Sequence, residues 1–298
     1  MSYYVSIILD NFPRKIVVMK NILVPTDFSE NASNAAEYAA VIAQACKATI
    51  LLLNVYTPTV SRYNVISALL ADEVARAKNE LKEKLQIIAK TLQDQYPGVK
   101  CNVSVELGES VEEILQAAKN YEADLIIMGT QGASSIEKIL LGSNAAAIVE
   151  KAICPVMVIP TNTTCRTPTK IVYATDYAYS DIEGARLLAA IAKPFDATIT
   201  FLHITTKEED IDDEINLIEK FTSEIKLATN YEHINSKIIS DNTVIMGLDD
   251  VVQNADADML AVSTRRRNLF EKLYNPSITK KLANYTRIPL LAFKANHH

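Results

Sequence analysis

Three of the seven glycines in this chain lie close together, at Gly129, Gly132 and Gly142, with Ser143 directly after the last. A loop with this Gly-x2-Gly-x9-Gly-Ser spacing can lay its backbone N–H groups against a phosphate chain, because glycine has no side chain to keep the phosphate away. The apolar run 123–128 before it is typical of a buried parallel strand, and the residues after it have a helical pattern. A strand, a glycine-rich loop and a helix start predict an anion site.

A second group of polar residues follows the apolar run Ile22–Val24, in the sequence Pro25-Thr26-Asp27. Asp27 is placed either to act as a helix cap or turn acid before the helical pattern that comes next, or to accept hydrogen bonds from a ribose hydroxyl or an adenine amino group. The residue type and spacing alone leave both roles open.

The segment Ile22–Ser29 and the glycine motif together resemble the ATP-binding branch of the universal stress protein family. The resemblance is close over Lys20–Pro160 and looser over Lys170–Phe293. It implies that the glycine motif contacts the triphosphate of ATP, with Mg2+, and that Val55, through its backbone, and Met128 hold the adenine. With this resemblance we favour the ligand role for Asp27. The implied binding residues are Pro25, Thr26, Asp27, Val55, Met128, Gly129, Gln131, Gly132, Gly142, Ser143 and Asn144, of which Gln131 is as readily a solvated side chain.

Composition narrows the class of protein. The formal net charge is −6, and both halves of the chain carry more acidic than basic residues, which disfavours binding to nucleic acid. The four cysteines have no paired spacing, which is typical of reduced thiols in a cytoplasmic protein, and the short apolar run near the start predicts no membrane span. Cysteine usage therefore favours a cytoplasmic protein, and the resemblance to the universal stress protein family implies a bacterial-type stress-response protein.

The sequence contains an internal repeat of one domain-sized unit. Ile22–Asp27 matches Ile171–Asp176 at a shift of 149, and from Asp124 to Ile159 the shift is 134 without a gap. Within each copy apolar runs rich in β-formers alternate with helical patterns, which predicts βαβ units and a parallel sheet. The fold class is therefore α/β, with two tandem domains, each a five-stranded parallel sheet with helices on both faces. The family resemblance implies that these domains are Rossmann-like and similar to adenine nucleotide alpha hydrolases. Ligands of such sheets bind beyond the strand C-termini.

The expected organisation is an N-terminal extension over 1–18, a nucleotide-binding domain over 19–160, a linker over 161–169 and a second domain over 170–294. The extension is expected to be a tail or an over-extended gene start, with an extra strand as the alternative. The last strands, Val156–Ile159 and Leu290–Phe293, are expected to pair the two domains, since apolar sheet edges are usually covered. A homodimer is also open, and the protein partners are not identified.

The second copy departs from the motif. Ser263, Arg266 and Pro276 replace the three glycines, while Asp176 and Ser277 remain. Side chains at former glycine positions block a close backbone approach, so we favour a degenerate, structural site, with anion binding by Arg265–Arg267 as the alternative. The acidic run 207–214 is expected to be a solvated helix start, and His203 and His233 are expected to be packing or surface residues.

No catalytic motif accompanies the nucleotide motif. The chain lacks a Walker-type lysine loop, and neither Asp27 nor Glu30 is placed by a motif as a general base. The sequence predicts an ATP-dependent binding or regulatory protein rather than a turnover enzyme. A slow ATPase or autokinase, with Ser143 as acceptor, and a nucleotide-independent scaffold are the alternatives.

Overall fold

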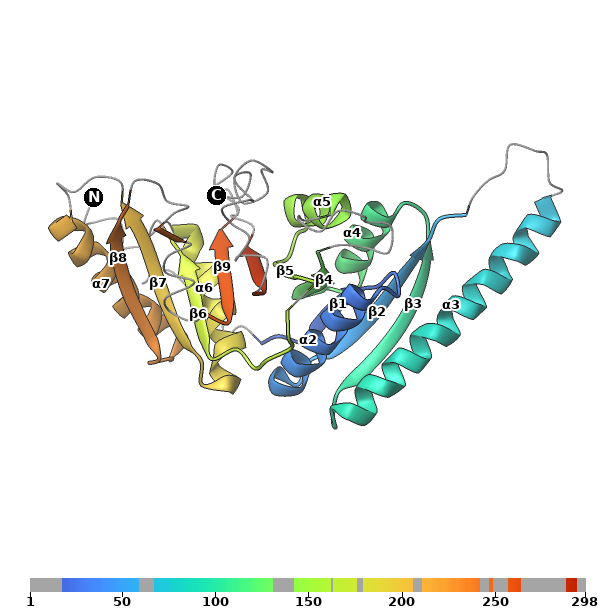
Figure 1. The fold of residues 1–298 in the computed structure, drawn as a ribbon, viewed down its shortest axis with the longest axis horizontal. Helices are drawn as coiled ribbons and strands as arrows, with labels where there is room; N and C mark the ends of the chain where they lie inside the picture. Colours follow the sequence, from blue (N-terminus) through green and yellow to red (C-terminus); the bar gives the residue numbers. More distant parts are fainter. Residues whose placement is uncertain are drawn as a thin grey trace.

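The computed structural model describes residues 18–58, 67–130, 142–161, 163–175, 179–205, 211–241, 247–248, 257–263 and 288–293. Strands and helices alternate along both copies (Figure 1). The first copy contains β1 (Asn21–Pro25), α2 (Glu30–Cys46), β2 (Thr49–Tyr56), α3 (Ser67–Gln95), β3 (Lys100–Leu107), α4 (Ser110–Asn120), β4 (Leu125–Gly129), α5 (Ser143–Lys151) and β5 (Val156–Ile159). The second contains β6 (Lys170–Ala174), α6 (Tyr179–Ala192), the 3-10 turn η1 (Lys193–Phe195), β7 (Thr198–Thr205), α7 (Ile211–Thr229), β8 (Ile234–Ser240), β9 (Met259–Ser263) and β10 (Leu290–Phe293).

The predicted α/β class is confirmed, and the strands of the two copies join into one sheet. Its order is β3-β2-β1-β4-β5-β10-β9-β6-β7-β8. Five parallel strands from each copy meet where β5 and β10 run antiparallel, with Leu290 opposite Val158 and Ala292 opposite Val156. The sheet is therefore larger than the five strands expected of each domain, because two apolar edge strands complete each other's hydrogen bonds.

The apolar residues of the strands alternate between two cores, one on each face of the sheet. Ile22 and Val24 of β1 belong to the core beneath α2, α3, α6 and α7, whereas Leu23 belongs to the core beneath α4 and α5. This alternation follows from the two-residue period of a strand, and it explains why β1 is apolar throughout. The first core contains residues of both copies, so the two halves share one packed layer.

An aspartate at the equivalent position of each copy holds the beginning of each half of the sheet. The carboxylate of Asp124 accepts hydrogen bonds from the backbone N–H groups of Lys20 and Asn21, at 2.7 and 2.9 Å. In the second copy Asp258 accepts from the N–H groups of Thr169 and Lys170, at 2.8 and 2.9 Å. The two aspartates, which the sequence repeat aligns with each other, thus make equivalent hydrogen bonds to the backbone in the two copies.

The segment between the copies is fastened to α2. The side-chain amide of Asn34 donates to the carbonyl of Thr163 at 2.8 Å, and the Tyr38 hydroxyl donates to the carbonyl of Thr164 at 2.9 Å. The Tyr38 oxygen also accepts from the N–H of Arg166 at 3.4 Å. Burial raises the pKa of Tyr38 to about 12, so its hydroxyl remains a donor over the physiological pH range.

Removing the carboxylate at the start of β1 should destabilise the fold. For Asp124→Ala we expect a loss of about 1.5–3 kcal/mol in the free energy of unfolding, because two backbone donors lose a charged acceptor. Urea denaturation measures this, with Asp94→Ala, an exposed change in α3, as the matched control. If both variants unfold at the same urea concentration, the carboxylate does not hold the strand.

The four cysteines are unpaired, and burial raises the pKa of each thiol, to about 11 for Cys46, Cys101 and Cys165 and about 12 for Cys154. A raised pKa favours the protonated thiol, so at pH 8 only about one thiol in a thousand at a pKa of 11 is the reactive thiolate. We expect iodoacetamide to label the native protein at least about 100-fold more slowly than the urea-unfolded protein, whose thiols have ordinary pKa values. The native rate should rise up to pH 11. Equal native and unfolded rates at pH 8 would contradict this.

Candidate functional site

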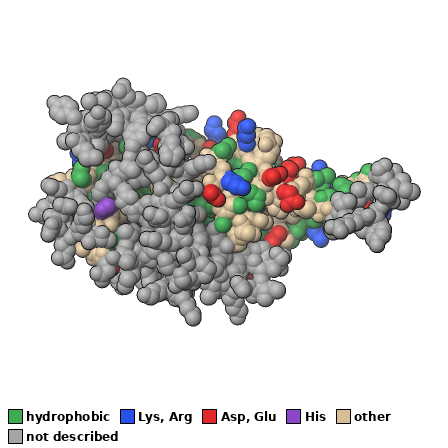
Figure 2. Space-filling model, turned by 90° about the horizontal axis from the view of Figure 1, so that it is seen from above, with side chains coloured by type: hydrophobic (Ala, Val, Ile, Leu, Met, Phe, Trp, Pro, Cys, Tyr) green, Lys and Arg blue, Asp and Glu red, His purple; other side chains and the backbone are tan. Residues whose placement is uncertain are grey.

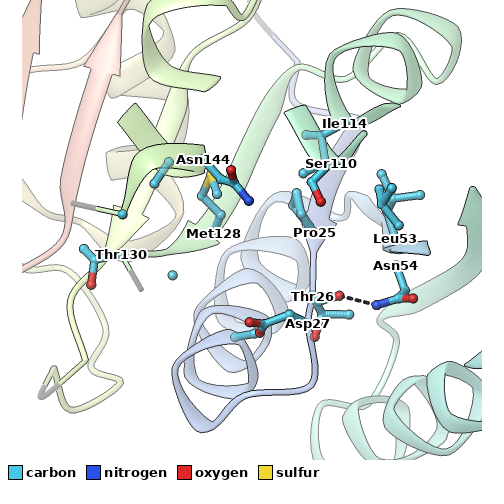
Figure 3. A pocket seen from close by; sticks show the side chains of 15 residues that line it. Pro25, Thr26, Asp27, Leu53, Asn54, Ser110, Ile114, Met128, Thr130 and Asn144 are labelled. Atoms are coloured by element: carbon cyan, nitrogen blue, oxygen red, sulfur yellow. Dashed lines mark hydrogen bonds between the residues drawn. The ribbon is translucent and has the colours of Figure 1, made fainter. Parts of the chain in front are cut away.

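A pocket opens at the carboxyl edge of the first half-sheet, where β1, β2 and β4 end and α4 and α5 begin (Figure 3). Its floor is apolar and its rim is polar. The lining residues are Pro25, Thr26, Asp27, Ala32, Leu53, Asn54, Val55, Ser110, Ile114, Met128, Gly129, Thr130, Gly142, Asn144 and Ala145. An apolar cavity with a few converging polar groups is the usual form of a small-molecule site.

Eight of the predicted binding residues lie in this one pocket, although they come from four separate parts of the sequence. They are Pro25, Thr26, Asp27, Val55, Met128, Gly129, Gly142 and Asn144. Ser143 begins α5 beside them but does not line the pocket, and Gln131 and Gly132 lie outside the described residues.

The turn after β1 holds Asp27 at the mouth of the pocket. Its Oδ1 accepts a hydrogen bond from the N–H of Ser29 at 3.1 Å, while the Ser29 hydroxyl caps α2 by accepting from the N–H of Ala32 at 3.2 Å. Between them Phe28 adopts a φ of 64°, a left-handed conformation that is uncommon for a bulky residue. Asp27 thus closes a local turn, the first of the two roles that its position suggested, and its side chain remains exposed and lines the pocket.

The floor beside this turn is fixed by a buried amide. Asn54 donates from Nδ2 to the carbonyl of Thr26 at 2.8 Å, and the N–H of Thr26 donates to the carbonyl of Leu53 at 2.8 Å (Figure 3). These two bonds tie the end of β1 to the end of β2. Asn54 therefore sets the position of Thr26 and Asp27, a role that the sequence analysis did not assign.

Gly129 is glycine because α2 passes directly over it. A Cβ built there would lie 2.6 Å from Asn31 Nδ2 and 3.2 Å from the Asn31 backbone carbonyl carbon. No side chain fits at that distance without movement of the helix start. The glycine motif predicts that a phosphate approaches the backbone closely, but at Gly129 the close neighbour is Asn31 of α2. Asn31 also donates a hydrogen bond to the Thr130 hydroxyl at 3.4 Å.

Two helix starts at the pocket have no side-chain cap. The N-cap residues are Glu109 for α4 and Gly142 for α5, and neither side chain bonds to the first turn of its helix. Backbone N–H groups in a first turn have no acceptor within the helix, and they carry partial positive charge. Ser110, Asn144 and Ala145 bring both starts to the pocket. The first turn of α4 carries Glu112 and Glu113, whereas the first turn of α5 has no acidic residue, so the start of α5 is the one that suits an anion.

The charges on the described surface around this region are mixed. Figure 2 shows Lys, Arg, Asp and Glu side chains close to one another over the first half of the chain. The described residues hold no cluster of three His, Cys, Asp or Glu side chains that could bind a metal ion, and no described helix is long and apolar enough to cross a membrane.

Comparison with known proteins agrees with the site and the fold. The profile of the universal stress protein family matches residues 19–160. A universal stress protein of Methanocaldococcus jannaschii is 34% identical over 147 residues, which cover 47% of this chain and 81% of that protein. One from Thermus aquaticus is 34% identical over 143 residues, covering 48% of this chain and 99% of that protein.

The chain belongs to the universal stress protein family. A crystal structure of a universal stress protein from Archaeoglobus fulgidus covers 95% of this chain and 99% of its own, with a TM-score of 0.70 and 20% identity. That likeness concerns the fold, and it extends over both copies. The family resemblance inferred from Ile22–Ser29 and the glycine motif is therefore confirmed.

The second copy keeps the scaffold of the site but differs from the first at its surface. His203 Nδ1 bonds to the carbonyl of Thr175 at 2.9 Å, as Asn54 bonds to that of Thr26. Ser263 stands at the position of Gly129 and is buried. Asp176, Arg265–Arg267, Pro276 and Ser277 lie outside the described residues.

His233 takes part in an ordinary surface contact. His233 pairs with Asp196 at 2.9 Å, and both side chains are exposed. Residues 207–210 of the acidic run lie outside the described residues, and α7 begins directly after them at Ile211.

The packing role of Gly129 can be separated from ligand binding. Gly129→Ala should lower the free energy of unfolding by about 1–3 kcal/mol, because the new methyl group overlaps Asn31. Asn31→Ala in the same chain should recover part of this loss, since it removes the amide but not the backbone carbon. Thermal denaturation of both single variants and the double variant measures the coupling, and strictly additive losses would contradict the proposed contact.

Proposed function

We propose that the first copy binds ATP and that occupancy, rather than turnover, is its function. The observation that carries this proposal is the convergence of eight sequence-predicted residues from four chain segments on one pocket at the carboxyl edge of the sheet. Parallel α/β sheets bind their ligands at this edge.

The triphosphate would lie against the start of α5. This start lacks a side-chain cap and has no acidic residue in its first turn, so N–H groups near Asn144 would donate to phosphate oxygens. Gly142 has φ −59° and ψ 153°, a conformation open to any residue. Glycine would therefore be needed at this position because it leaves space for the phosphates, and not because of its backbone angles.

The adenosine would lie in the apolar part of the pocket, among Leu53, Ile114 and Met128, with polar contacts from the Val55 backbone and Asp27. Among the described residues, Asp27 is the only carboxylate that lines the pocket. Mg2+ prefers oxygen ligands and is commonly held by substrate phosphates with one or two carboxylates, so Asp27 and the triphosphate together suit it.

Turnover is the weaker reading of the same site. Fast phosphoryl transfer requires a positioned nucleophile, a metal and cationic clamps. One oxygen of Asp27 is already bonded to the N–H of Ser29, and the described lining contains no lysine or arginine. Slow hydrolysis or autophosphorylation is the alternative, and we propose that the second copy serves as a structural partner.

One ATP should bind per chain, and Gly142→Val should abolish binding while the fold survives. The valine side chain would project where the phosphates lie, but it can adopt the backbone angles found at residue 142. Isothermal titration with ATP, ADP and AMP measures this, and circular dichroism verifies folding. The matched control is Val111→Ile in α4, which does not line the pocket. Two equal sites, or unchanged affinity in Gly142→Val, would contradict the assignment.

Occupancy should raise the melting temperature without hydrolysis. When free ATP is 100 times its dissociation constant, binding stabilises the folded state by about 2.7 kcal/mol. ATP and a non-hydrolysable analogue should therefore shift the melting temperature alike, and phosphate release should stay far below the ~1–100 s⁻¹ of kinases. Release at several per second, lost in Asp27→Ala, would identify an enzyme instead.

A further inference from the structure

A second cavity lies at the opposite edge of the sheet, between the two copies. Its volume is about 630 Å³, within the range of roughly 300–1,000 Å³ typical of ligand sites. The end of α2, the α6–η1 segment and the end of α7 form its walls, together with Val18 and Met19. The first copy contributes Ala45, Cys46 and Lys47. We refer to it as the interdomain groove.

The groove is cationic in a chain that is acidic overall. Lys47, Arg186 and Lys193 line it, and no Asp or Glu is among the described lining residues, although the chain has 36 acidic and 30 basic residues. Lys47 and Lys193 are exposed side chains. Such a set of charges suits an anionic group.

Helix capping accounts for only part of this arrangement. The helices α2 and α7 end at the groove, and their carbonyl ends attract cations. The Lys193 ammonium lies 3.4 Å from the carbonyl of Asn230, longer than an ordinary hydrogen bond, and an ammonium has three donors. Capping also gives no reason for a cavity of this size.

The groove also exposes apolar side chains. Leu227 is 83% exposed and Val18 is 55% exposed, and both line it together with Ala189 and Pro194. An exposed leucine beside a cationic cavity suits a molecule with an anionic head and an aliphatic tail. The concave shape favours a single free molecule over a flat membrane surface.

We propose that the interdomain groove binds a free, single-chain anionic amphiphile, of the class of a medium-chain carboxylate. The anionic head lies toward Lys47 and Lys193, and the aliphatic tail covers Leu227. The site is separate from the nucleotide pocket and does not depend on ATP. It is built by residues of both copies.

The test uses the full chain and three probes: decanoate, decanol and inorganic phosphate. Titration calorimetry should detect binding of decanoate. Decanol should bind more weakly because it has no charge, and phosphate should bind more weakly because it has no aliphatic tail. Saturating ATP should leave the decanoate affinity unchanged. If phosphate binds as tightly as decanoate, the proposal of an amphiphile site is wrong and the groove is an anion site without a role for an aliphatic tail.

Variants locate the site. Lys193→Glu and Leu227→Asp should each weaken decanoate binding at least about fivefold, through charge reversal and loss of apolar cover. The controls are Lys237→Glu in β8 and Leu217→Asp in α7, exposed residues outside the groove, which should leave it unchanged. Equal effects of groove and control variants would overturn the proposal. Binding to phosphatidylglycerol vesicles but not to free decanoate would also overturn it. The proposal also fails if the original chain binds none of the three probes and Lys193→Glu only lowers stability.

Discussion

The close approach of β4 to the start of α2 is the constraint on which this end of the molecule depends. Because residue 129 has no side chain, Asn31 can lie directly over the end of β4. The helix therefore starts close to the sheet, and the turn formed by Asp27 and Ser29 is held at the mouth of the pocket. A single missing methyl group thus sets both the packing of a helix and the shape of a candidate binding site.

Helix α2 carries this placement across the molecule. Its 17 residues span about 25 Å at 1.5 Å per residue. Asn34 and Tyr38 fasten the connecting segment along the way, and at its end Cys46 lies 3.8 Å, sulfur to oxygen, from the carbonyl of Ala190 in α6. One end of α2 lies at the pocket beyond β1, β2 and β4, and the other lies at the interdomain groove. Because packed helices move as bodies, coupling between the two sites would require α2 to shift as a whole.

Much of the fold could be predicted from periodicity alone. The helical pattern expected after Asp27 corresponds to α2 (Glu30–Cys46), and the pattern expected after the glycine motif corresponds to α5 (Ser143–Lys151). Apolar strands buried on both faces leave a continuous signal in sequence, and so do amphipathic helices. The repeat was equally visible, because Asp124 and Asp258 occupy matching positions and make matching bonds.

The composition of the pocket was less accessible to sequence reasoning. The glycine motif indicated Gly142 and Asn144, but nothing local marks Ser110 or Ile114, which reach the pocket only because α4 follows β3 across the sheet. Periodicity identifies elements and not the side chains that distant elements bring together. The motif also gave an incomplete account of Gly129, since its nearest neighbour is Asn31.

The second copy shows why a site can change while its fold remains. Asp258 accepts hydrogen bonds from the N–H groups of Thr169 and Lys170 where the strands begin, whereas Ser263, in place of Gly129, lies where a strand ends. The second copy has therefore kept the contacts at the beginning of its strands while its sequence differs at their carboxyl ends. The interdomain groove lies at the edge of the strand beginnings, which both copies have kept. Residues of both copies line this groove, so its shape depends on how the two halves of the sheet pack against each other.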